Sequence, residues 1–154
     1  MIEFGIAGLL AAADLLIKAR IEREPQENFP RPLPNTKGRI TIRKFHNDGF
    51  PFGVLREHFA VVKVVSLTVT LAVAGILGYL AGKREYRLER AGLTLVLGGA
   101  LSNLYDRLVR HYVVDYFTIE AGKLKKVVFN LGDFCVFIGS FLFVLAEYGR
   151  DLRS

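Results

Sequence analysis

The chain has 154 residues, the size of one domain, and 51% of them are apolar, with a positive mean hydropathy. Its net charge of +6 comes from basic residues spread over the connecting segments, and no nucleic-acid-binding motif is present, so we expect no nucleic-acid partner. The single cysteine, Cys135, excludes an internal disulfide and a CxxC motif, and its apolar surroundings indicate a small buried hydrophobe.

Four apolar segments predict helices at about residues 2–20, 59–81, 90–110 and 130–149. The second is long enough to cross a bilayer and carries only Lys63 as a charge. The first lacks the basic start of a signal peptide, so we read it as a retained helix. Four such segments leave too little polar surface for a water-soluble globule. The fold class predicted is therefore a membrane α-helical protein with four transmembrane helices, and residues 1–154 form a single integral-membrane domain.

Two polar excursions, at about residues 21–58 and 111–129, separate these helices. The first contains all five prolines, which exclude a continuous helix there, and residues 39–45 alternate as a strand does. In the second, residues 113–119 and 125–129 predict a hairpin. Both excursions would lie on the same membrane face, so they predict a small β-sheet platform at that interface.

Charge does not fix the orientation of the chain in the membrane. The loop 83–90 and the tail 150–153 are basic and would share one side, which suits the cytoplasm. The excursion at residues 21–58 would lie on the other side and is also rich in lysine and arginine. The number of positive charges therefore does not decide which side faces the cytoplasm. The basic segments indicate contact with anionic lipid headgroups.

Asp115 and Asp133 are the first candidates for chemistry, because each lies inside an apolar run where a lone charge is costly. Two such carboxyl groups brought together would titrate as a coupled pair and could activate a water molecule. Ion pairs with Arg107 or Arg110 are the structural alternative.

Further polar residues recur at helical spacing near the same helix ends. Asn103 and Arg107 are four residues apart, and Asn130 lies three residues before Asp133. Asp14 and Lys18 are four residues apart and predict a helix-end ion pair that positions other groups. All these ends face the excursions, so one compact polar site is possible. The three histidines do not share metal-ligand spacing, and neither a metal nor a cofactor is expected.

Small residues at the end of the third segment complete this pattern. Gly98, Gly99 and Ala100 would allow the helices to approach closely beneath the polar site. Asp106, beside Arg107, reads as part of an interfacial structural pair.

Five sequence blocks together carry a resemblance to a known family. They are DLLIK at 14–18, NDGF at 47–50, NLYDR at 103–107, VVDYF at 113–117 and FNLGD at 129–133. In this order and with these spacings they resemble the conserved blocks of lipoprotein signal peptidase, or signal peptidase II.

The resemblance implies a four-helix inner-membrane aspartic protease with an extracytoplasmic β-sheet platform. Such a protease cleaves signal peptides from diacylglyceryl-modified prolipoproteins just before the lipidated cysteine. By motif position Asp115 and Asp133 correspond to the catalytic pair. The positions that match substrate-binding or supporting residues are Asn103, Arg107, Asn130, Asn47, Asp14 and Lys18. The expected partners are lipid-modified precursors and membrane lipids, the expected state is a monomer, and the expected location is the bacterial cytoplasmic membrane.

Three departures from the family pattern bear on specificity. Ser102 stands where a glycine usually precedes the asparagine, Gly132 replaces the usual alanine, and residues 50–53 read Phe-Pro-Phe-Gly. Two alternatives therefore stay open. The chain could be a catalytically inactive or client-restricted scaffold of the same fold, or a small transporter or ion-pathway protein.

Overall fold

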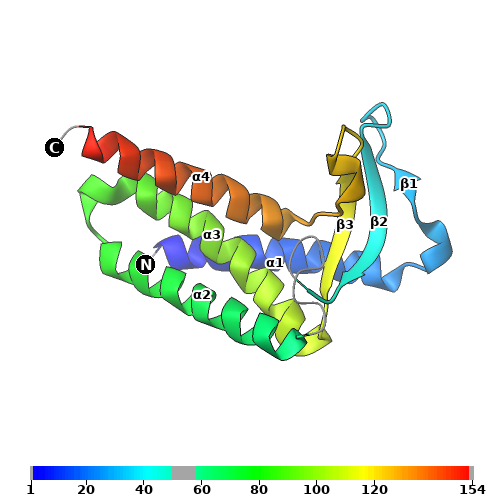
Figure 1. Cartoon of the computed structure of the whole chain (residues 1–154), viewed down its shortest axis with the longest axis horizontal. Coiled ribbons are helices and arrows are strands. Elements are labelled where there is room, and N and C mark those ends of the chain that lie inside the picture. Colours follow the sequence, from blue (N-terminus) through cyan, green and yellow to red (C-terminus); the bar gives the residue numbers. More distant parts are fainter. Residues whose placement is uncertain (1, 50–57, 153–154) are drawn as a thin grey trace.

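Four long helices pack side by side, and a small sheet lies across one end of them (Figure 1). The computed structural model describes residues 2–49 and 58–152. The α-helices are α1 (Ile2–Arg23), α2 (Phe59–Leu80), α3 (Arg87–Tyr105) and α4 (Leu131–Asp151), and the strands are β1 (Arg31–Pro32), β2 (Ile40–Asn47) and β3 (Val113–Ile119). Short 3-10 helices are η1 (Gln26–Asn28), η3 (Arg84–Tyr86) and η5 (Leu124–Lys126), and a π-helical turn, η4 (Asp106–Arg110), follows α3.

The four helices lie in the four apolar segments, with shifted ends. The third segment stops being α-helical at Tyr105 and continues as the π-helical turn. The fourth helix begins at Leu131, one residue later than predicted, because Asn130 is its N-cap. The Asn130 side chain accepts the Asp133 backbone N–H, and the Asp133 carboxylate accepts the Asn130 backbone N–H. Asn130 and Asp133 therefore meet through a capping box rather than along one helix face.

Hydropathy and exposure together indicate a membrane-type helical fold. Helices α2 and α4 are long and apolar enough to cross a membrane. Helix α1 carries more charge, but its acidic Glu3 and Asp14 and its Lys18 are buried inside the bundle. Its outer surface instead exposes large apolar side chains, among them Leu9 and Leu16, each 72% exposed. That distribution is the reverse of a water-soluble helix.

The three described strands form one antiparallel sheet in the order β1-β2-β3. Buried Ile21 of α1 packs against Val114 and Tyr116 of β3, which joins the sheet to the bundle. The pairing of β2 with β3 shifts register between Ile42 and Phe45. It then brings Asn47 to the start of β3, where the polar residues gather.

The predicted second hairpin strand, residues 125–129, is wrong over most of its length. Residues 124–126 form the 3-10 turn η5, in which the Val127 N–H bonds the Leu124 carbonyl. Only Phe129 forms a bridge to β3, opposite Phe117. The turn uses backbone groups that a regular ladder would need, so the chain reaches β3 as a short extended segment.

Glycines bring α3 close to its neighbours. A Cβ atom at Gly99 would overlap the Gly132 carbonyl of α4, and one at Gly98 would lie 2.8 Å from Leu10 Cβ of α1. The predicted close approach is thus confirmed at both glycines, and it holds α3 and α4 together directly beneath the polar residues.

We expect Gly99→Ala to destabilise the protein by about 1–3 kcal/mol, since the added methyl group has no room and the helices must move apart. Gly75→Ala on α2 is the matched control, because nothing lies within 4 Å of a Cβ there. Unfolding in detergent, followed by circular dichroism, measures both variants. Equal stability of the two would contradict the packing argument.

Candidate active site

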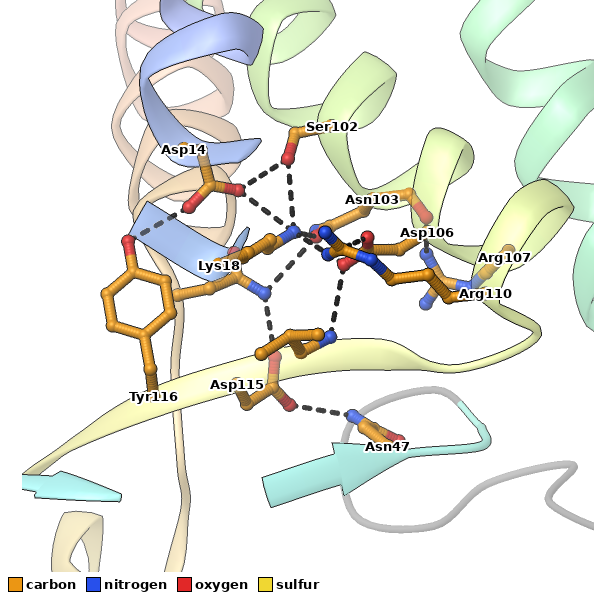
Figure 2. A network of polar contacts seen from close by, with 12 residues as sticks. Asp14, Lys18, Asn47, Ser102, Asn103, Asp106, Arg107, Arg110, Asp115 and Tyr116 are labelled. Carbon is orange, nitrogen blue, oxygen red and sulfur yellow. Dashed lines mark hydrogen bonds and ion pairs between the residues drawn. The ribbon is translucent and has the colours of Figure 1, made fainter. Parts of the chain in front are cut away.

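The polar residues predicted from the sequence converge at the end of the bundle that faces the sheet (Figure 2). They come from five places in the chain: the second half of α1, the end of β2, the end of α3 with its π-helical turn, β3, and the start of α4. Figure 2 shows Lys18 between the carboxyl groups of Asp14 and Asp106, with Asp115 and Asn47 below them on the sheet.

Asp115 and Asp133 each accept two N–H groups. Asp115 accepts the side-chain amide of Asn130 at 2.7 Å and that of Asn47 at 3.0 Å. Asp133 accepts the side-chain amide of Asn103 at 3.0 Å and the backbone N–H of Asn130 at 3.1 Å. Every carboxylate oxygen is therefore fixed by a donor, and asparagines hold both groups in place.

The orientation of these amides follows from Lys18. An ammonium group can only donate, so the Asn103 oxygen must face Lys18, 2.8 Å away. The NH₂ of Asn103 is then left for Asp133. Asn130 donates to both Asp115 and the Asn103 oxygen, the latter at 3.2 Å. Lys18 therefore orients the Asn103 amide so that its NH₂ group points to Asp133, and the Asn103 oxygen in turn accepts the Asn130 amide that holds Asp115.

Lys18 is fully buried and lies between two acids. Its ammonium is 2.9 Å from Asp14 and 3.1 Å from Asp106, and both carboxyl groups are also buried. The predicted ion pair of Asp14 with Lys18 is confirmed. The expectation that Asp106 belongs with Arg107 needs correction, because Asp106 meets Lys18, and its other oxygen pairs with Arg110 at 2.7 Å.

Asp106 also fixes the start of β3. The Val114 backbone N–H donates to Asp106 at 3.0 Å, which places Asp115 on the cavity side of the strand. Tyr116, the next residue, faces the opposite way and donates its hydroxyl to Asp14 at 2.9 Å. The same hydroxyl accepts the Leu131 N–H at 2.9 Å, so it links β3, α1 and the first residue of α4.

Arg107 lies buried beside this network. Its guanidinium donates to the carbonyl groups of Asn103 at 3.3 Å and of Gly49 at 3.4 Å. Arg107 therefore connects the π-helical turn to the residues that follow β2, and it brings positive charge close to both aspartates.

A cavity of about 300 Å³ opens onto the two aspartates. Asn47, Asn103, Arg107, Asp115 and Asp133 form its polar wall. Its other lining residues are mostly apolar or belong to the segment before α4: Phe45, His46, Asp48, Val113, Lys126, Val127, Val128, Phe129 and Phe137. Such a cavity, apolar with a few convergent polar groups, is the usual form of a site for an organic substrate.

Burial, followed by the negative charge of Asp133, raises the pKa of Asp115 from 3.8 to about 7, although the amides of Asn47 and Asn130 lower it. Asp115 is only 2% exposed. A carboxyl group with this pKa can hold a proton at neutral pH and release it during a reaction.

Comparisons with known proteins agree with this geometry. Residues 6–148 match the family model described as signal peptidase (SPase) II. The lipoprotein signal peptidase of Moorella thermoacetica is 34% identical over 152 residues, 95% of this chain and 96% of that protein. The chain belongs to the signal peptidase II family.

Other relatives match a smaller share. The lipoprotein signal peptidase of Clostridium acetobutylicum is 32% identical over 77% of each chain. That of Haemophilus influenzae is 33% identical over 70% of this chain, and the match spans 64% of its own length. A solved structure of a bacterial membrane enzyme, determined by the in meso method, has a TM-score of 0.76 at 22% identity and covers 96% of this chain and 87% of its own. It shares the fold.

Two departures from the signal peptidase II pattern meet at one carboxyl group. The Ser102 hydroxyl donates to Asp14 Oδ2 at 2.6 Å and accepts Lys18 at 3.0 Å. A Cβ atom at Gly132 would lie 3.1 Å from the same oxygen. The third departure, residues 50–53, lies outside the described residues.

Sequence reasoning missed three contributors to this site. Ser102 was noted only as a departure, and Tyr116 and Arg110 were not expected to contact Asp14 and Asp106. For Tyr116 a signal existed, because strand alternation places it on the face opposite Asp115. Nothing in the sequence indicated which helix lies there. Cys135 is buried and free, as expected.

Proposed function

We propose that this protein is a membrane aspartic endopeptidase that cleaves signal peptides from diacylglyceryl-modified prolipoproteins immediately before the lipidated cysteine. The observation that carries the proposal is the pair of carboxyl groups, Asp115 and Asp133, held by asparagine amides on the polar wall of one cavity. Membership of the signal peptidase II family favours this activity over a transporter or a scaffold.

In the proposed mechanism Asp133 is ionised and Asp115 is neutral. Asp133 takes a proton from a bound water, and the water oxygen attacks the carbonyl carbon of the scissile peptide bond. The Asp115 proton stabilises the developing oxyanion. When the tetrahedral intermediate breaks its C–N bond, Asp115 gives its proton to the nitrogen of the leaving cysteine residue, which departs as an amine. The carbonyl group re-forms, and the other product is the carboxylic acid of the signal peptide. No metal or cofactor takes part in these steps.

Asn103 and Asn130 keep the carboxyl groups oriented, with Asn47 supporting Asp115 from β2. Arg107 contributes positive charge near both acids. In this scheme Asp14 and Lys18 do not react. They fix the amides and bind α1 to α3 and β3.

The proposal extends to the setting of the chain. All four helices would span the bacterial cytoplasmic membrane, with residues 1–154 acting as one monomeric peptidase domain. The sheet and the site would face the extracytoplasmic side, where precursors arrive. The burial of charge inside α1 and the exposed apolar residues on its surface support this arrangement. Lipids would then contact the exposed apolar faces of the helices.

The test is cleavage by the purified protein in detergent. A diacylglyceryl-modified prolipoprotein is incubated with it, and mass spectrometry identifies the new N-terminus. The matched control is the same precursor without the lipid. Cleavage of the modified form alone, directly before its cysteine, is the expected result. A folded protein that cleaves none of several modified precursors would contradict the proposal.

The raised pKa of Asp115 gives the expected dependence on pH. Below about pH 7 Asp115 keeps its proton, and above it the group ionises and can no longer act as the acid. We therefore expect kcat/KM for the lipidated precursor to fall as pH rises through about 7. Stability should also fall as pH rises. The raised pKa of Asp115 stabilises the folded state fully below its ordinary value of 3.8, and this stabilisation is lost as pH rises from there through about 7.

Asn47→Leu should move this decline to higher pH, because the Asn47 amide stabilises the ionised form of Asp115 and lowers its pKa. Rate measurements from pH 5 to about pH 9 on both proteins, at subsaturating precursor, test the shift. A decline that stays in place, or moves to lower pH, would show that Asp115 is not the group observed.

A further inference from the structure

The extended segment before α4 is fixed to β3 on one side. Phe129 donates its N–H to the Phe117 carbonyl at 2.7 Å, and its own carbonyl accepts the N–H groups of Phe117 at 3.0 Å and Tyr116 at 2.9 Å. Both backbone groups of Phe129 therefore point towards β3. The Phe129 ring lies 5.9 Å from that of Phe134 and 6.5 Å from that of Phe137, so side chains of α4 also hold the segment.

Val128 presents the opposite side. Backbone groups of successive residues in an extended chain point to alternate sides, so the N–H and carbonyl of Val128 point away from β3. Within residues 2–49 and 58–152, neither group has a hydrogen-bond partner. The preceding N–H, that of Val127, is already used by the Leu124 carbonyl. Val128 thus forms a short open edge beyond β3.

This edge belongs to the same cavity as the two aspartates. Val127, Val128 and Phe129 line that cavity together with Asn103 and Asp133. Val128 is partly exposed, so a ligand can reach it. An unpaired N–H and carbonyl on one extended residue are what an added strand requires.

We propose that Val128 binds the substrate peptide in an extended conformation, as an added strand, exchanging two backbone hydrogen bonds with one residue next to the scissile bond. The proposal rests on the proposed endopeptidase function and names how the peptide is held. Specificity for side chains would then come from the apolar wall that Phe129 and Phe137 provide.

The chemistry of the substrate explains why such an edge is needed. A signal peptide in a membrane is helical, and its carbonyl groups are already hydrogen-bonded within the helix. Attack on one carbonyl requires the helix to open around it, which leaves backbone groups without partners in a largely apolar environment. The N–H and carbonyl of Val128 replace two of the lost bonds at the place where the chain must be extended.

Substrates with single N-methylated amides test the proposal on the unaltered enzyme. Each methyl group removes one backbone donor within about three residues of the scissile bond, and both kcat/KM and the Kd of the precursor are measured. Methylation at one position, the residue paired with Val128, should reduce both affinity and kcat/KM by about tenfold, the worth of one lost hydrogen bond in a desolvated site. Methylation at the adjacent residues, whose N–H groups point the other way, should cost less.

Val128→Pro supplies the second arm, because proline removes the N–H while the extended conformation of Val127, φ −115° and ψ 135°, suits a residue before proline. Val128→Ala is the reference, since it loses the side chain but keeps the N–H. We expect Val128→Pro to bind and cleave about tenfold less well than Val128→Ala. Proline removes the N–H of Val128 and the methyl group removes the N–H of the substrate, so the two changes break different hydrogen bonds of one pair. Either change also pushes the two strands apart and weakens the bond that is left, so the combined loss should be smaller than the product of the single losses.

Equal effects of methylation at all positions, or multiplying losses, would overturn the added-strand proposal. Failure of the proposed function looks different. In that case lipid-modified precursors would bind, with or without a preferred methyl position, but would not be cleaved by the wild-type protein. The Kd values of the methylated precursors therefore test the pairing with Val128 even if the protein cleaves none of them.

Discussion

Asp115→Asn and Asp133→Asn are each expected to lower the rate of precursor cleavage by at least about 10³-fold. An amide can neither take a proton from water nor supply one to the leaving amine, so the loss appears in kcat. Both side chains keep their shape, and the amides of Asn103 and Asn130 can still contact the remaining carbonyl oxygen. Precursor binding should therefore change much less than turnover.

Glu120→Gln is the matched control for these two variants. It removes a carboxylate just beyond the end of β3, where Glu120 is exposed, lies 3.9 Å from Arg43 and does not line the cavity. Its cleavage rate should stay near that of the wild type. Circular dichroism in the same detergent checks that all three variants are folded. If a folded Asp115→Asn or Asp133→Asn variant cleaves at the wild-type rate, the aspartic mechanism is wrong.

Lys18→Met is expected to destabilise the protein by about 3 kcal/mol or more, because it leaves two buried carboxylates without their shared cation. Asp14 and Asp106 are 1% and 0% exposed, so water cannot replace the ammonium group. The variant also removes the donor that orients Asn103. Thermal unfolding in detergent should show a large fall in midpoint, and residual activity should be low.

Lys125→Met provides the comparison, since Lys125 is exposed on the turn η5 and its replacement should shift the midpoint little. A second variant distinguishes the loss of the Lys18 charge from the loss of its packing. In Lys18→Met, Asp106 keeps its ion pair with Arg110, whereas Asp14 loses the cation that Lys18 supplied. Adding Asp14→Asn removes this buried charge, so the double variant should be more stable than Lys18→Met alone. A double variant that is less stable would mean that Lys18 acts through packing rather than through its charge.

Local patterns were sufficient for the helices and for β2. Apolar runs marked the helical segments, and the alternating residues 39–45 marked most of the strand Ile40–Asn47. The same reasoning was wrong for residues 125–129. Their β-branched composition favours a strand, but turn hydrogen bonds ending at Val127 limit the pairing to Phe129. Propensity describes single residues, whereas a ladder depends on which backbone groups remain free.

For the candidate site, too, some features followed from the sequence and others only from the tertiary structure. The sequence by itself determined the residue types, their order and their helical spacing, and hence the resemblance and the choice of Asp115 and Asp133. Only the tertiary structure decided that Lys18 lies between Asp14 and Asp106 and that the Tyr116 hydroxyl donates to Asp14. It also showed that the N–H and carbonyl of Val128 have no partner among residues 2–49 and 58–152. Spacing along one helix fixes which residues share a face, because the helical repeat is local. Which faces meet depends on how the helices and the sheet pack around buried charges, and those contacts join residues up to 117 positions apart.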